Sequence, residues 1–169
     1  TKMRTIGYYT NERLRKDRRL LHRPTIKLFF VDRRARFMSF LSGLVTAPKV
    51  NLAGGGVDEG ESAAQALGRE LRQECGLRCE EQDLSKLPVL MDCLTPSSWQ
   101  NWRKKRLVIR YMMVPNLGNI QPDNKELIAP AIHKTIADFQ TRLQLSPGTR
   151  PEAAAAYLEA AYRWLFMQV

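Results

Sequence analysis

The order of apolar and helical patterns in this sequence predicts an α/β fold, with a mixed central sheet covered by helices on two faces. Apolar runs of strand length alternate with stretches of helical periodicity, which is typical of layered α/β domains. With 169 residues, no internal repeat and no recognisable linker, we expect one domain spanning 1–169.

The first half of the chain predicts two strands and a glycine turn. Residues 26–31 (IKLFFV) form a strand with a buried centre, 32–35 a turn, and 36–41 (RFMSFL) a returning strand. The segment 48–52 then leads into a glycine-rich turn, which includes Asp58 and Glu59 and comes directly before a helix.

That helix, over 62–76, is specified by its ends. Ser62 is a good N-cap, Gln65 completes a capping box, and Gly76 suits a left-handed C-terminal cap. One face is apolar and spaced for burial, with Leu67, Leu71 and Cys75.

The second half predicts two strands and two helices. The strands are 87–94 (LPVLMDCL) and 107–114 (LVIRYMMV). Apolar residues at helical spacing predict an amphipathic helix over 131–144, and Pro151 marks the first turn of a C-terminal helix within 150–169.

Glu70, Gln73 and Glu74 share one side of the 62–76 helix, because residues three and four apart are neighbours on a helix surface. Two carboxylates and an amide oxygen suit a hard cation such as Mg²⁺, with Mn²⁺ as the alternative. A loop that ends at a helix N-terminus suits phosphate. The segment therefore indicates metal and phosphate chemistry.

The stretch 55–77 (GGVDEGESAAQALGRELRQECGL) resembles the signature of the Nudix hydrolases. That signature is Gly, five residues, Glu, seven residues, Arg-Glu, an aliphatic residue, any residue, Glu-Glu, any residue, Gly and an aliphatic residue. The matching positions are Gly55, Glu61, Arg69, Glu70, Leu71, Glu74, Gly76 and Leu77. The resemblance implies the Nudix fold, an α/β/α sandwich, for the whole chain.

The resemblance also implies roles for the signature residues. Glu70 and Glu74 are expected to bind metal, with Glu70 also a base or water-orienting group, and the Gly54 carbonyl is a further ligand. Arg69 and Glu61 resemble the pair that braces the loop against the helix. Gly55 and Gly56 are expected to approach the substrate. The implied reaction is hydrolysis of a diphosphate linkage in a nucleoside diphosphate joined to another group.

Gln73 stands where the family usually has the first Glu of the Glu-Glu pair. Its carbonyl can ligate Mg²⁺ but brings no charge, so binding of further ions should weaken more than binding of the first. Loss of activity with retention of the fold is the alternative. A further acidic ligand often comes from a later loop in the family, which makes Glu126 a candidate, against the ordinary alternative of a solvated loop acid.

The net charge of +10 is the second functional observation. A basic N-terminal extension, 1–23, holds more than half of it. For 11–23 we favour a solvated helix face over a surface that attracts a polyphosphate or RNA. Trp102, Arg103 and Lys105 form a second cluster that either grips a base and a phosphate or is an ordinary basic turn.

These features predict a nucleotide or polyphosphate as the small-molecule substrate, a nucleoside triphosphate, nucleotide sugar or dinucleoside polyphosphate. The alternatives are the 5′ end of RNA, or a silent domain that binds nucleotide or RNA. Three cysteines make no disulfide framework, and we find no bilayer-spanning run or leader, so a cytoplasmic location is expected. A homodimer is compatible with the sequence but unsupported by it.

Overall fold

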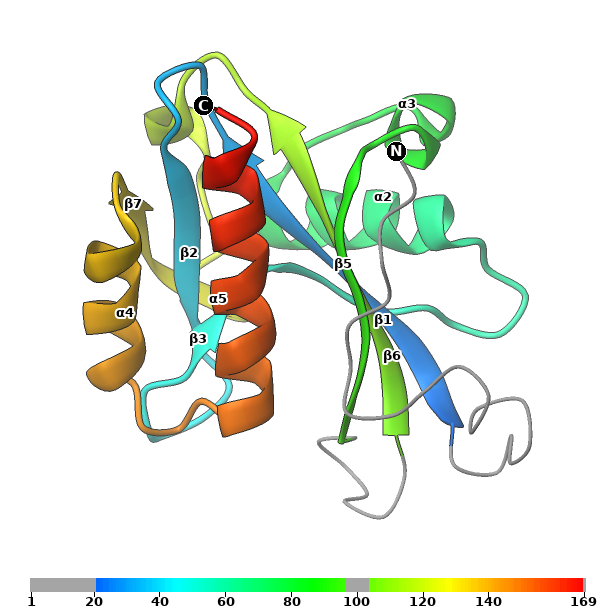
Figure 1. The fold of residues 1–169 in the computed structure, drawn as a ribbon. Helices are drawn as coiled ribbons and strands as arrows, with labels where there is room; N and C mark the ends of the chain where they lie inside the picture. Colours follow the sequence, from blue (N-terminus) through cyan, green and yellow to red (C-terminus); the bar gives the residue numbers. More distant parts are fainter. Residues whose placement is uncertain (1–20, 97–103, 169) are drawn as a thin grey trace.

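The computed structural model describes residues 21–96 and 104–168 as a seven-stranded sheet between helices (Figure 1). The strands are β1 (Leu21–Val31), β2 (Phe37–Ser42), β3 (Val50–Asn51), β4 (Ala53–Gly56), β5 (Val89–Pro96), β6 (Lys104–Met113) and β7 (Leu127–His133). The helices are α2 (Ala63–Cys75), α3 (Glu81–Ser85), α4 (Ile136–Gln144), α5 (Pro151–Phe166) and the short 3₁₀ helix η2 (Leu117–Asn119).

The longest strand, β1, lies at the centre of the sheet. It runs parallel to β6 and antiparallel to β2 and β4, while β6 pairs with β5 and β2 pairs with β3 and β7. The sheet is therefore mixed, and the predicted α/β class with helices on both faces is confirmed.

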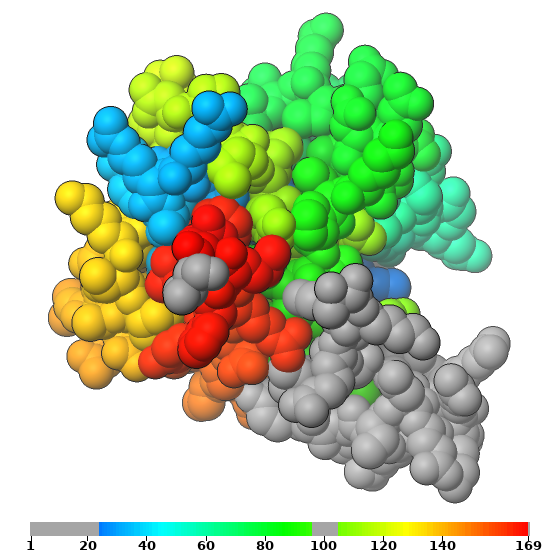
Figure 2. Space-filling model, turned by 45° about the horizontal axis from the view of Figure 1, so that its top comes forward, coloured from blue at the N-terminus to red at the C-terminus, as the bar shows by residue number. Residues whose placement is uncertain are grey.

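Two apolar layers follow from alternation along β1, because successive side chains point to opposite faces. Ile26, Leu28 and Phe30 pack beneath α2 and α3, whereas Phe29 and Val31 pack beneath α4 and α5. Figure 1 shows α5 in front of the sheet and α2 behind it, and Figure 2 shows α4 and α5 together on one face.

The α4–α5 face carries the aromatic part of the core. Phe29, Phe37 and Phe139 meet edge to face, with ring centroids 5.3–6.1 Å apart. Tyr157 and Trp164 of α5 are buried in the same layer, so these two side chains belong to the hydrophobic core.

The ends of α2 are those that the sequence predicts. The Ser62 hydroxyl accepts from the N–H of Gln65 at 3.1 Å, and the Gln65 side-chain oxygen accepts from the N–H of Ser62 at 2.9 Å. Gly76 ends the helix with a φ of 64°. Pro151 likewise opens α5, with Arg150 as N-cap. The predicted turn at 32–35 is confirmed, with Asp32 accepting from two backbone N–H groups.

Two predictions are wrong in detail. The predicted glycine-rich turn begins later than expected, because Gly54 to Gly56 pair with β1 as part of β4 and the turn comes after them. The predicted helix over 131–144 begins only at Ile136, where Thr135 caps it, since 131–133 pair with β2 as the end of β7. The spacing of Ile132 and Ile136 is typical of a helix, but the backbone of 131–133 forms its hydrogen bonds with the neighbouring strand β2.

Neither β7 nor the short α3 was predicted from the sequence, and the predicted strand limits shift by up to five residues. All three cysteines lie in the described residues and are unpaired. Within 21–96 and 104–168, no helix has the length and apolar character needed to cross a membrane.

Candidate active site

Three carboxylates from two separate segments meet at one edge of α2. Glu70 and Glu74 are one helical turn apart on α2, and Glu126 comes from the loop before β7. One oxygen of each lies within 4.8 Å of the others. Glu74 is buried, Glu70 is partly buried and Glu126 is exposed, so the cluster opens to solvent on one side.

The loop that brings Glu126 to the cluster is shaped by Asp123. Its carboxylate accepts the N–H groups of Lys125, Glu126 and Leu127 at 3.0–3.1 Å. Its own N–H donates to the Glu74 carbonyl at 2.7 Å, which ties the loop to α2. Glu126 therefore lies before a strand, and not before the predicted helix.

The glycines of β4 bring bare backbone against the cluster. The Gly54 N–H donates to Glu74 Oε1 at 2.8 Å, and its φ of 119° is one that residues with a side chain rarely adopt. A Cβ on Gly55 would lie 2.6 Å from Glu70 Oε1. A Cβ on Gly54 would instead meet the Ile26 carbonyl of β1 at 2.1 Å. Glycine is therefore needed at Gly54 for strand pairing and at Gly55 for the approach of Glu70.

Arg69 connects the loop after β4 to α2. It donates to both Glu61 carboxylate oxygens at 2.9 Å, to Glu70 Oε1 at 2.9 Å and to the Gly56 carbonyl at 3.1 Å. A guanidinium is suited to this role because its donors have a fixed planar geometry. Hydrogen bonds to Glu61 raise the pKa of Arg69, which stays charged.

Lys27 is a buried cation beside the cluster. Its ammonium donates to Asn51 Oδ1 at 2.9 Å and to the carbonyls of Leu52 and Gly54 at 3.2 and 3.0 Å. Burial raises the pKa of Glu74 to about 7, while the Lys27 charge and the Gly54 N–H act in the opposite direction. Burial in turn lowers the pKa of Lys27.

Several predicted residues remain apart from this cluster. Gln73 is exposed on α2, and its part in metal binding stays a prediction. Lys105 lines a hollow between β1 and the first turn of α5. Trp102 and Arg103 lie outside the described residues, as do residues 1–20 of the basic extension.

Sequence reasoning missed the cations that join Lys105 in that hollow. Lys27 could have been found, because it is the single charged residue in the apolar run 26–31. Alternation along the strand places it on the same face as Phe29 and Val31. Lys49 and Arg150 offered no such signal, because only the packing of α5 against β1 brings them together.

The donor set fits a hard divalent cation. Three close carboxylates repel one another, and oxygen ligands of this kind are those that Mg²⁺ and Mn²⁺ take. The Gly54 carbonyl already accepts from Lys27, but a carbonyl oxygen has two lone pairs. The residues present are therefore compatible with an ion at this position.

A family model identifies the family to which this chain belongs. The NUDIX domain model matches residues 21–134, and the chain belongs to the Nudix family, whose hydrolases act on phosphorus-containing anhydride bonds. Comparison with curated proteins gives no match.

Solved structures show the same fold at low identity. The MutT protein of Methanosarcina mazei is 12% identical, with a TM-score of 0.57 over 84% of this chain and 91% of that one. An Ap4A hydrolase of C. elegans is 14% identical, with a TM-score of 0.58 over 88% and 100%. The E. coli ORF135 protein is 22% identical, with a TM-score of 0.56 over 83% and 87%.

Proposed function

We propose that this chain is a Mg²⁺-dependent pyrophosphohydrolase that cleaves the diphosphate linkage of a nucleoside diphosphate derivative. Such substrates are nucleoside triphosphates, nucleotide sugars and dinucleoside polyphosphates, and Mn²⁺ is the alternative ion. The observation that carries the proposal is the convergence of Glu70, Glu74 and Glu126 within 4.8 Å beside the backbone of β4.

Each residue has a role that follows from its contacts. Glu70, Glu74 and Glu126 would hold the ion, with the Gly54 carbonyl as a further ligand. When bound, Mg²⁺ neutralises phosphate charge and makes bound water more acidic. Glu70 is the candidate for orienting water or accepting its proton, because Arg69 fixes its carboxylate at 2.9 Å.

Gln73 limits how many ions the site should hold. It offers a neutral oxygen where the family usually has a carboxylate, so we expect one tightly bound ion and weaker binding of others. Replacing Gln73 with Glu should raise Mg²⁺ affinity if the residue faces the ion. Unchanged Mg²⁺ dependence would place Gln73 outside the site.

The 5′ end of RNA is a second candidate substrate. The observation that favours it is the net charge of +10, because cations that contact several phosphates hold a nucleic acid. Binding to RNA should weaken steeply as salt rises, whereas turnover of a small nucleotide should change much less. That comparison separates the two substrate classes.

A hydrolysis screen over nucleoside triphosphates, nucleotide sugars and dinucleoside polyphosphates, with Mg²⁺ or Mn²⁺ varied, tests the proposal. Glu74→Gln should lower kcat/KM by about 100-fold or more, since even residues behind metal ligands affect activity 10–100-fold. The matched control is Glu80→Gln, which changes an exposed glutamate before α3. Turnover with Glu74→Gln unimpaired would show that the site is assigned wrongly, and no turnover of any substrate would favour a silent binding domain.

A further inference from the structure

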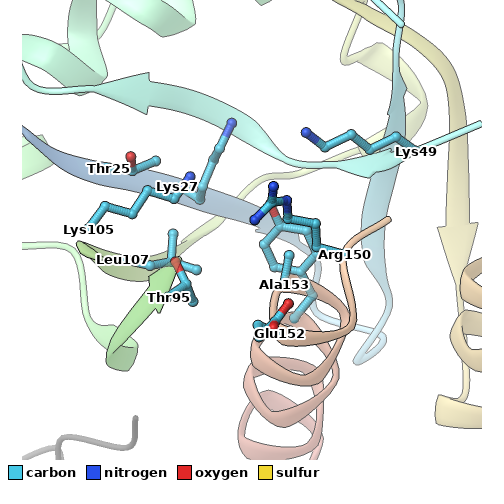
Figure 3. A pocket seen from close by; sticks show the side chains of 10 residues that line it. Thr25, Lys27, Lys49, Thr95, Lys105, Leu107, Arg150, Glu152 and Ala153 are labelled. Atoms are coloured by element: carbon cyan, nitrogen blue, oxygen red, sulfur yellow. The ribbon is translucent and has the colours of Figure 1, made fainter. Parts of the chain in front are cut away.

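A small hollow lies next to the carboxylate cluster, between β1 and the first turn of α5 (Figure 3). Lys27 connects the two sites. Its side chain lines the hollow, and its Nζ donates to the carbonyl of Gly54, whose N–H holds Glu74. Lys27 therefore lines the hollow and at the same time contacts Gly54, which is a proposed metal ligand.

The hollow is strongly basic. Four of its lining residues are cations and one is an acid, Glu152, so the lining carries four positive charges less one negative, or +3. The cations are Lys27, Lys49, Lys105 and Arg150. Figure 3 shows the nitrogen ends of Lys49, Lys105 and Arg150 turned toward a common space. The Lys27 ammonium instead donates to Asn51, Leu52 and Gly54. Burial and the Arg150 charge lower the pKa of Lys49, as expected where like charges are crowded.

A buried hydroxyl in the hollow has no hydrogen-bond partner. Thr95 is 3% exposed, and its Oγ1 is unpaired within the described part of the chain. Leaving a buried polar group unpaired is unfavourable, and a bound acceptor would satisfy this hydroxyl. The N-terminus of α5 also meets the hollow at Arg150 and Ala153, and no side chain caps it. Helix N-termini favour anions.

The size of the hollow selects a small anion. Its volume is about 40 Å³, which is room for roughly three water molecules. Pockets that enclose a whole drug-sized ligand measure about 300–1,000 Å³. A phosphoryl group fits these dimensions, whereas a base or a sugar does not.

We infer that this hollow seats a phosphoryl group of the substrate, beyond the diphosphate held at the carboxylate cluster. The inference rests on the proposed function and narrows it to substrates with three or more consecutive phosphates. A phosphoryl group would offset part of the +3 formal charge of the lining, which a neutral sugar would not. A free nucleotide and a 5′-triphosphate end of RNA share this oligophosphate chemistry.

Calorimetry with inorganic tripolyphosphate, in buffer with chelator and no divalent metal, tests the seat directly. Wild-type protein should bind this probe, and Lys49→Gln should weaken binding about tenfold, because a charged hydrogen bond contributes about 1.5–3 kcal/mol. Thr95→Val, which preserves shape, should weaken binding about threefold by removing the hydroxyl. The control Lys86→Gln replaces an exposed lysine after α3 and should bind as wild type.

Steady-state kinetics gives an independent readout. Lys49→Gln should raise KM for a nucleoside triphosphate about tenfold and leave KM for a nucleotide sugar unchanged. Its melting temperature should not fall, since Lys49 is crowded by like charge. Comparing the affinity for an RNA oligonucleotide with a 5′-triphosphate and for one with a 5′-hydroxyl shows whether the hollow also binds the 5′-phosphates of RNA.

The outcomes separate the two proposals. Binding of tripolyphosphate without any turnover would keep the seat and reject the enzymatic function. Turnover of nucleotides with equal tripolyphosphate affinity in wild type, Lys49→Gln and Lys86→Gln would reject the seat and keep the function. Equal losses of affinity in Lys49→Gln and Lys86→Gln would show general charge attraction, and would also overturn the inference.

Discussion

Replacing Gly55 with Ala would displace Glu70 without disturbing the strand around it. The Cβ of alanine would lie 2.6 Å from Glu70 Oε1 and 2.9 Å from Glu70 Cδ. Ordinary contact begins at about 3.4 Å, so the carboxylate must retreat by 3.4 less 2.6, or about 0.8 Å. The atoms that move belong to the end of a flexible side chain, and Gly55 lies outside the left-handed region, so alanine can adopt its backbone.

The expected effect on function exceeds the effect on folding. A misplacement of about 1 Å can reduce rate about 100-fold, and indirect disturbance of ligands lowers metal affinity about 10–100-fold. We therefore expect Gly55→Ala to weaken Mn²⁺ binding, measured by calorimetry, by about 10–100-fold and to lower kcat/KM similarly. The free energy of unfolding should change by less than about 1 kcal/mol.

Gly60→Ala is the matched control, because it introduces backbone strain at a position where the added methyl group would touch no neighbouring atom. Gly60 has φ +77°, and a Cβ there meets nothing within 4 Å. It should destabilise the fold by about 1–2 kcal/mol and leave Mn²⁺ affinity unchanged. If folded Gly55→Ala binds Mn²⁺ as tightly as wild type, Glu70 does not belong to the metal site and the reasoning is refuted.

Two further substitutions test how the fold supports the site. Arg69→Lys should lower the free energy of unfolding by about 1–2 kcal/mol in urea denaturation and weaken Mn²⁺ binding, because lysine cannot bond Glu61 through two nitrogens while also holding Glu70. An unchanged Mn²⁺ affinity would show that Glu70 needs no such support. Burial alone would raise the pKa of Asp32, but hydrogen bonds from Arg36 and Arg34 outweigh burial and lower this pKa below 3.8. The ionised Asp32 therefore stabilises the fold fully above pH 3.8, and this stabilisation is lost as pH falls through the folded-state pKa. Asp32→Asn should therefore be about 1 kcal/mol less stable than wild type at pH 7, and a gap that does not narrow as pH falls below 3.8 would contradict this.

Local features of the sequence were enough to predict α2 and its residues. Capping by Ser62, the left-handed Gly76 and the spacing of Glu70 and Glu74 depend on contacts within one or two turns. The strands on either side were found through their apolar runs, although their limits were not. The mixed sheet followed from the order of these elements and from the family resemblance.

Long-range pairing defeated the prediction wherever local pattern and tertiary contact disagree. The glycines at 54–56 read as a turn, but Gly54 and Gly55 pair with Lys27 and Ile26. Ile132 reads as helical, but it pairs with Met38. In both places the backbone bonds to a strand more than twenty residues away, which no local window can register.

The sequence by itself determined the helix that carries Glu70 and Glu74, because its caps and its spacing depend on residues close together in the chain. The contacts between Arg69 and Glu61 and the class of chemistry were expected from the family resemblance. Only the tertiary structure decided that Glu126 joins Glu70 and Glu74, and that Lys27, Lys49 and Arg150 surround one hollow. The physical reason is that these groups come from distant segments. Their approach is set by how β1, the loop tied by Asp123 and the start of α5 pack, and not by any spacing in the chain.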